Sequence, residues 1–225
     1  MRIARKFRKS QTLKILIMAI LLFPLVTLGQ KNINLGQGIL KIDFKRLPTL
    51  QFFNDTSSKL LPKTITVTKD KDGEFVIKNH LKVTTWFKPE GIWLDYSIFL
   101  IRIDTLIGKW YRVLVDNEKG TTLWMKSDLT NKFVKWNIFL TKETTAIEKN
   151  PEFNLEIKAS PSESALTIKR IEKTDCFEAL EIKGEWLRIR TNKILDCNQS
   201  KKIIKSGWIK WRQNNRLTIN YGLTC

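Results

Sequence analysis

Alternating hydrophobic and polar positions predict short β-strands along most of the chain. The segment from Ile92 to Ile103 is rich in aromatic and β-branched residues, and its later part alternates with polar positions, a pattern typical of a half-buried strand. No strong amphipathic helix is indicated beyond the N-terminal segment and one short helical turn near Asn137 to Leu140. We therefore predict an all-β protein. Further strands are expected at Trp110–Val115, Phe177–Ile182, Trp186–Arg190, Ser206–Trp211 and Leu217–Asn220.

The clearest hairpin joins Phe177–Ile182 to Glu185–Arg190 through the two-residue loop Lys183-Gly184. Glycine can supply the positive φ that such a tight loop requires. Alternation along the second strand predicts a core face and a solvent face. The two sets are Leu187 and Ile189 on one face, and Trp186, Arg188 and Arg190 on the other.

The first 29 residues have the pattern of an export signal. Six basic residues precede an apolar run from Ile15 to Leu28, and Thr27 and Gly29 place small residues before a cut at Gln30, the spacing that signal peptidases accept. An uncleaved membrane anchor is the alternative, although the run contains Pro24 and is shorter than the roughly 20 residues that span a bilayer. We expect a secreted or periplasmic protein that meets a membrane only through an uncleaved signal segment.

The chain is strongly basic. Its formal net charge is +18, and removal of the signal, which holds six of the forty basic residues and no acidic ones, leaves 34 basic and 22 acidic residues, or +12. Such a charge attracts polyanions, and salt weakens that attraction. The lysines are spread among acidic residues, so a solvated basic surface is the plainer interpretation. Nucleic acid is not expected as a partner of an exported protein.

Residues 153–222 resemble the bacterial Src-homology-3-like domain, a small barrel of five to six strands common in exported proteins. Three motifs carry the resemblance: Ile157–Ser162 is similar to the opening strand with its Ser-Pro turn, Leu180–Arg190 to the central hairpin, and Gly207-Trp208-Ile209 to the "G-W-V" strand. A departure from the family pattern is the long loop that carries Cys197. The resemblance implies a barrel fold and a binding role.

A weaker copy of the same pattern lies upstream. Gly108–Val113 parallels Gly184–Ile189, and Leu123–Lys126 parallels Gly207–Lys210. These parallels predict two Src-homology-3-like barrels in tandem. One unrelated β domain before a single Src-homology-3-like domain is the alternative.

The expected organisation follows from these parallels. A first β domain covers residues 36–140, with an opening strand from Leu50 to Ser58 and an insertion from Lys63 to Pro89 that carries its own hairpin at Asp70–Gly73. The polar segment 141–152 is predicted to be a linker.

Cysteine usage fits an oxidising compartment. Cys176 and Cys197 flank the predicted hairpin, so a disulfide between them is favoured, whereas Cys225 could pair with either. The chain contains no C-x-x-C motif, and a metal site is not expected.

Candidate catalytic residues are few. His80 is the single histidine, so neither a Cys–His pair nor a histidine-rich zinc site of the kind used by cell-wall peptidases with such modules can be assembled. Asp95, Asp104 and Asp116 could serve as glycosidase carboxylates, but no spacing singles out a pair. We expect a protein that is not an enzyme and has no cofactor.

The resemblance also implies a binding surface, because ligands of the family lie against aromatic side chains near the loops at one barrel edge. The transferable candidates are Trp186, Arg188, Trp208, Lys210, Trp211 and Tyr221, with Trp110, Trp124 and Trp136 in the first domain. Trp186 and Trp208 are expected to be the most exposed, since Leu187 and Ile209 take the opposite face. The alternative is that these rings fill a small core.

The sequence thus predicts an exported binding protein that recognises cell-wall peptide or glycan, or an envelope protein, through aromatic and basic surface. A structural subunit of an envelope complex, with its aromatic residues buried against another chain, is the second hypothesis. A third is a polyanion binder, whose affinity would fall steeply with salt and survive Trp208→Ala.

Overall fold

The computed structural model describes residues 35–57, 59–192 and 203–223, all within one compact unit. The predicted signal segment and its cleavage site lie outside the described residues, so export stays a prediction. Among the residues described, no helix is long and apolar enough to cross a membrane.

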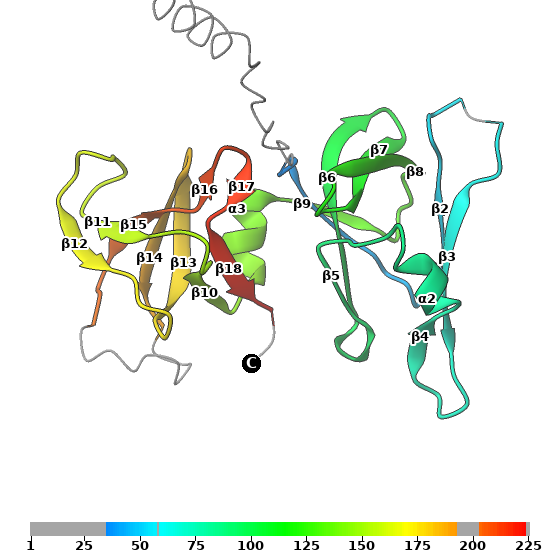
Figure 1. Ribbon diagram of the computed structural model, residues 1–225, viewed down its shortest axis with the longest axis horizontal. Coiled ribbons are helices and arrows are strands. Elements are labelled where there is room, and N and C mark those ends of the chain that lie inside the picture. Colours follow the sequence, from blue (N-terminus) through cyan, green and yellow to red (C-terminus); the bar gives the residue numbers. More distant parts are fainter. Residues whose placement is uncertain (1–34, 58, 193–202, 224–225) are drawn as a thin grey trace, which may run out of the picture. The chain divides into compact units, whose positions relative to one another are not determined.

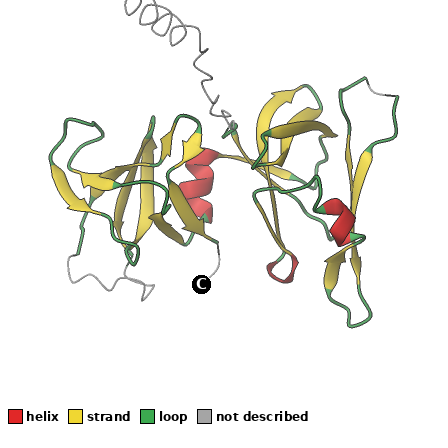
Figure 2. Cartoon of the chain, in the orientation of Figure 1, coloured by secondary structure: helices red, strands yellow, loops and turns green. Residues whose placement is uncertain are grey.

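Strands dominate the fold and the helices are short (Figure 2), which confirms the all-β prediction. The first half of the unit, residues 35–135, contains β1 (Gly38–Lys41), β2 (Thr49–Phe52), β3 (Lys63–Lys69), β4 (Phe75–Ile77), α2 (His80–Val83), β5 (Gly91–Trp93), η1 (Leu94–Tyr96), β6 (Ile98–Ile107), β7 (Trp110–Asp116), β8 (Thr121–Lys126) and β9 (Lys132–Lys135). A helical segment formed by α3 (Trp136–Ile138) and η2 (Phe139–Glu143) follows, as predicted for this position.

The second half, residues 146–223, contains the remaining strands (Figure 1). They are β10 (Ala146–Lys149), β11 (Glu156–Lys158), β12 (Thr167–Arg170), β13 (Cys176–Lys183), β14 (Trp186–Thr191), β15 (Gly207–Lys210), β16 (Arg212–Gln213), β17 (Arg216–Leu217) and β18 (Ile219–Gly222).

The two halves repeat one strand order. The first-half sheet runs β8-β7-β6-β1-β9, and the second-half sheet contains β15-β14-β13-β10-β18 in the equivalent order. In the second half β11 and β12 extend the sheet beyond β15. In the first half β2, β3 and β4 form a separate sheet, which a single bridge between Phe53 and Trp124 joins to β8.

The repeat extends to the residue register. Trp110 pairs with Lys126 and Arg112 with Trp124, and in the second half Trp186 pairs with Lys210 and Arg188 with Trp208. Both hairpins also carry a β-bulge at the same point of the first strand, between Ile103 and Thr105 in β6 and between Ala179 and Glu181 in β13. An identical register with an identical bulge indicates that the two halves are copies of one architecture.

The hairpin loops are also equivalent, although they differ by one residue from the prediction. Lys183 pairs with Trp186, so the loop is Gly184-Glu185 rather than Lys183-Gly184. Its counterpart is Gly108-Lys109. The glycine of each loop has a positive φ, +60° and +55° respectively, a conformation that costs glycine little.

Three predicted elements are wrong in detail. The strand expected from Ile92 to Ile103 is broken, because Ser97 adopts a left-handed conformation at φ 57° between η1 and β6. The predicted linker 141–152 contributes β10, which lies between β13 and β18 in the sheet. In each half a further strand, β1 or β10, precedes the predicted opening strand, which the structure contains in part as β2 or β11.

No sheet closes into a barrel within the described ranges. The predicted tandem Src-homology-3-like barrels therefore stay a prediction, while the shared strand order and register are observed.

The core consists of two clusters that meet at β1. Leu40 belongs to a cluster within the first half, whereas its neighbour Ile39 belongs to one shared with the second half. Successive strand residues point to opposite faces, so β1 is buried on both sides. Phe139 and Leu140 of the helical segment also lie in the shared cluster. Burial on both faces of β1 explains why the halves form one unit.

Candidate functional site

The structure brings four of the predicted binding residues together on the outer face of β14 and β15. Trp186 lies opposite Lys210, and Arg188 lies opposite Trp208. Leu187 on the other face is fully buried, as alternation predicts. We call these four residues the outer ladder of the second half.

The outer ladder is largely covered. Trp208 is only 7% exposed, so its predicted exposure is wrong. The Lys183 ammonium lies 5.2 Å from the centre of its ring, and Lys158 of β11 is its neighbour across the sheet. Trp186 is half-buried. Only part of the predicted aromatic surface is therefore accessible.

The cations of the outer ladder already have anionic partners. Arg188 donates to Glu181 at 3.1 Å, and Lys210 lies 2.6 Å from Glu163 and 3.6 Å from Glu185. The hydrogen bond to Glu163 raises the pKa of Lys210 above its ordinary value. A ligand anion would have to compete with these carboxylates, which makes the ladder a poor anion site.

Trp211 and Tyr221 pack against the helical segment between the two halves. The Trp211 indole is buried, donates to the carbonyl oxygen of Gly184 at 3.1 Å and packs against Trp136 at 6.1 Å between ring centres. Tyr221 packs edge-on against Phe139. These contacts, and the burial of Trp136, do not support their predicted roles in ligand binding.

The Tyr221 hydroxyl belongs to a polar network around Glu90. It donates to one carboxylate oxygen of Glu90, while Arg102 and Asn117 donate to the other. Burial and the negative charge of Glu90 raise the pKa of Tyr221 well above its ordinary value. The network ties β18 to the segment that precedes β5.

The first half repeats the ladder with its own contacts. The Arg112 guanidinium lies 5.8 Å from the Trp124 ring centre and bonds to Asp104. Trp110 packs edge-on against Phe53 at 5.5 Å between ring centres. Both predicted rings are half-buried and engaged in packing.

The structure describes Cys176 and His80, two of the residues considered for disulfide, metal or catalytic roles. Cys176 is buried and disulfide-bonded. No disulfide joins two described residues, because Cys197 and Cys225 both lie outside them, so the predicted Cys176–Cys197 pairing stays a prediction. His80 is exposed. In the described ranges no group of three or more His, Cys, Asp or Glu side chains could hold a metal ion.

The best candidate site lies in the first half, between β3 and α2. This pocket, here called the lysine pocket, has a volume of about 550 Å³ and contains no acidic side chain in its lining. None of its three lysines forms an ion pair with a described carboxylate, and all three are exposed. The lining comprises Pro62, Lys63, Thr64, Thr66, Lys78, Asn79, Lys82, Val83 and Trp86.

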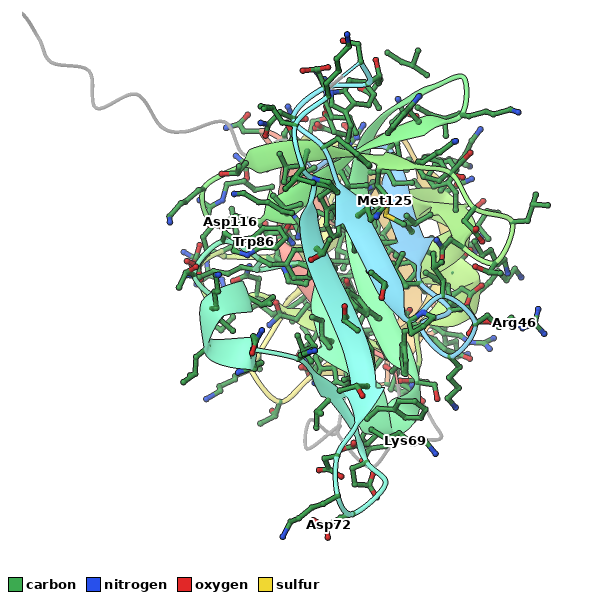
Figure 3. The ribbon with its side chains drawn as sticks, turned by 90° about the vertical axis from the view of Figure 1, so that its right-hand side faces the viewer. Arg46, Lys69, Asp72, Trp86, Asp116 and Met125 are labelled. Carbon is green, nitrogen blue, oxygen red and sulfur yellow. The ribbon has the colours of Figure 1, made fainter. Side chains whose placement is uncertain are left out.

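Trp86 forms the aromatic wall of the lysine pocket. Its ring packs against Phe52 at 5.8 Å and against Phe87 at 5.5 Å between centres, while the Lys63 ammonium lies 5.0 Å from its centre. Figure 3 shows Trp86 on the same side of the molecule as α2 and Asp116. The core thus anchors the ring and keeps it half-buried beside the cations.

The backbone of β3 adds one N–H donor on the side of β4. The Lys78 amide donates to the carbonyl oxygen of Thr66 at 2.9 Å, one residue beyond the end of β4. In a strand the backbone groups of residues i and i+2 face the same side. The N–H of Thr64 therefore faces the side on which β4 has already ended.

Sequence reasoning missed the lysine pocket because its cations come from separate segments. Lys63, Lys78 and Lys82 each have no acidic residue within three positions along the chain, but many other lysines share this property, so it does not single out the pocket.

In comparisons with known proteins, no family model and no curated protein matches the chain.

Proposed function

We propose that the protein is an exported, non-enzymatic binding protein that attaches to anionic material of the cell envelope through the lysine pocket. One observation carries the proposal, namely that three lysines and one tryptophan surround a single pocket without a carboxylate. Like charges around one cavity repel one another, and a ligand anion would relieve that repulsion. The aromatic and basic chemistry is the kind predicted from the sequence, at a different place in the fold.

Export rests on the predicted signal segment, and the absence of enzymatic activity on the lack of a catalytic constellation in the sequence. The Trp208 region is not part of the proposed site, because Trp208 is buried and Lys210 is paired with Glu163. Binding should accordingly survive Trp208→Ala in molecules that remain folded.

Co-sedimentation of the chain from Gln30 onward with envelope fragments, across a salt series, tests the proposal. The fragments are used intact and after removal of their anionic polymers. We expect salt-sensitive pelleting with intact fragments only, because exposed charges are screened as ionic strength rises.

The decisive variant is K63Q/K78Q/K82Q, and its matched control is K109Q/K142Q/K173Q, which removes three exposed lysines elsewhere. We expect the pocket variant to lose affinity at least tenfold and the control to change less than threefold. Equal losses in both variants would show that net charge alone drives binding. Pelleting that does not depend on the anionic polymers would overturn the proposal.

A further inference from the structure

The donor set of the lysine pocket distinguishes between classes of anion. Lys63, Lys78 and Lys82, whose ammonium groups each have three N–H donors, line the pocket with Thr64, Thr66 and Asn79. The Thr66 hydroxyl lies 3.3 Å from the Thr49 hydroxyl. The lining contains no arginine. Many donors with a charge of +3 call for a ligand group with more charge and more acceptors than one carboxylate carries.

A phosphoryl group meets these requirements better than a carboxylate. A phosphate monoester carries about −1.5 to −2 charges and three acceptor oxygens at neutral pH. A carboxylate carries one charge and two oxygens, and its preferred partner is the planar fork of arginine. Lysine binds as a point charge from any direction, which suits the tetrahedral phosphoryl group.

The pocket is also larger than the anion alone requires. Its volume of about 550 Å³ lies in the range of small-molecule sites rather than of single-ion sites. The half-buried Trp86 ring forms an apolar wall beside the cations, and such a wall suits the carbon skeleton to which the anion is attached. We propose that the lysine pocket binds a phosphoryl group carried on a sugar or polyol. This inference rests on the proposed function and names its ligand class.

An NMR titration of the chain from Gln30 onward distinguishes phosphoryl ligands from carboxylate ligands. The ligands are glucose 6-phosphate, glucuronate, glucarate and glucose, at matched ionic strength. Glucarate carries two carboxylates, so it controls for total charge. We expect glucose 6-phosphate to shift the backbone amide signals of Thr64, Thr66 and Asn79, and to bind at least tenfold more tightly than either carboxylate.

Two variants test whether the ligand-induced shifts of the amide signals depend on the pocket lysines. K63Q/K78Q/K82Q should abolish these shifts, while K109Q/K142Q/K173Q should retain them. If glucarate binds as tightly as glucose 6-phosphate, the phosphoryl inference is wrong while the anion-binding function stands. If envelope fragments bind only through the control lysines, the proposed function itself fails.

Two sources could supply the phosphoryl group. Vesicles that contain phosphatidic acid, a phosphate monoester, compared with phosphatidylcholine vesicles, test a lipid headgroup, and envelope polymer that carries phosphate monoester groups tests a glycan or polyol source. Binding to either source that depends on the pocket lysines supports the inference. Binding to neither, with glucose 6-phosphate also inactive, overturns it.

Discussion

The two halves of the molecule share a strand order, a register and a bulge, and in both the arginines of the sheet pair with acidic residues, Arg112 with Asp104 and Arg188 with Glu181. In the second half, Arg188, Arg190 and Lys210 of the sheet each contact a glutamate. In the first half, Lys63 of β3 and Lys78 and Lys82 near α2 have no ion-pair partner among the described carboxylates, although Lys88 contacts Glu118. The shared strand pairing thus fixes which side chains face one another across each sheet. The three pocket lysines, which lack an ion-pair partner among the described carboxylates, lie outside the shared strand order.

Equivalent tryptophans also differ in burial. Trp208 and Trp124 occupy the same register position opposite an arginine. Trp208 is buried beneath Lys183, whereas Trp124 is half-buried and contacts Arg112. Identical pairing therefore does not give identical exposure.

The largest expected effect tests this difference in burial. Trp208→Ala should lower the free energy of unfolding by about 3–5 kcal/mol, the usual cost of removing a buried tryptophan. Trp124→Ala should cost less, since the ring is already partly exposed. Urea unfolding of both variants measures the two costs. Equal costs would mean that the two ladders are energetically equivalent despite their different cover.

The next effect concerns the contact between the halves. Tyr221→Phe removes a hydrogen bond to the buried Glu90 carboxylate, and bonds to charged groups contribute about 1.5–3 kcal/mol. We expect a loss of that size at neutral pH, measured by urea unfolding. Tyr96→Phe is the control, because Tyr96 is 64% exposed, and it should change stability little.

The same variant has a pH signature. The pKa of Tyr221 is raised in the folded protein, so the unfolded chain releases the tyrosine proton near pH 10 while the folded chain retains it. Folding stability should therefore fall as the pH rises above about 10. Tyr221→Phe should make this alkaline decline shallower, and an unchanged slope would contradict the assignment.

A smaller effect tests the equivalence of the hairpin loops. Gly108 and Gly184 both have positive φ, and a Cβ atom at either position would meet no other atom within 4 Å. Alanine should thus cost only the backbone strain, about 1–2 kcal/mol, at both positions. Thermal unfolding of Gly108→Ala and Gly184→Ala should give similar losses, whereas clearly unequal losses would show that the loops are not equivalent.

The smallest effect on stability is expected when the ion pairs of Lys210 in the second half are removed. E163Q/E185Q removes both carboxylates that contact Lys210. Surface ion pairs contribute about 0–1 kcal/mol, so stability should change little. The freed Lys210 should add weak, salt-sensitive binding to envelope fragments in the sedimentation assay. No gain would show that an unpaired lysine on this ladder is insufficient for binding.

Sequence patterns predicted the hairpins well because the signals are local. Leu187 and Ile189 are buried and Arg190 is exposed, as alternation predicts. The β10 strand was missed because only Ala146 and Ile147 of its four residues are apolar, too short a run to distinguish from a linker. The covering of Trp208 was missed because the covering residues come from neighbouring strands.

The sequence by itself determined the strand class, the Gly-containing hairpins and the repeated Trp-x-Arg pattern, since periodicity and glycine conformation act between residues close in the chain. The tertiary structure decided that Tyr221 joins the halves through Glu90. It also decided that Lys63, Lys78 and Lys82 line one pocket with Trp86. Those outcomes depend on which distant strands pair and in what register. A basic composition therefore predicts attraction to anions, but only the folded chain locates the pocket that could hold one.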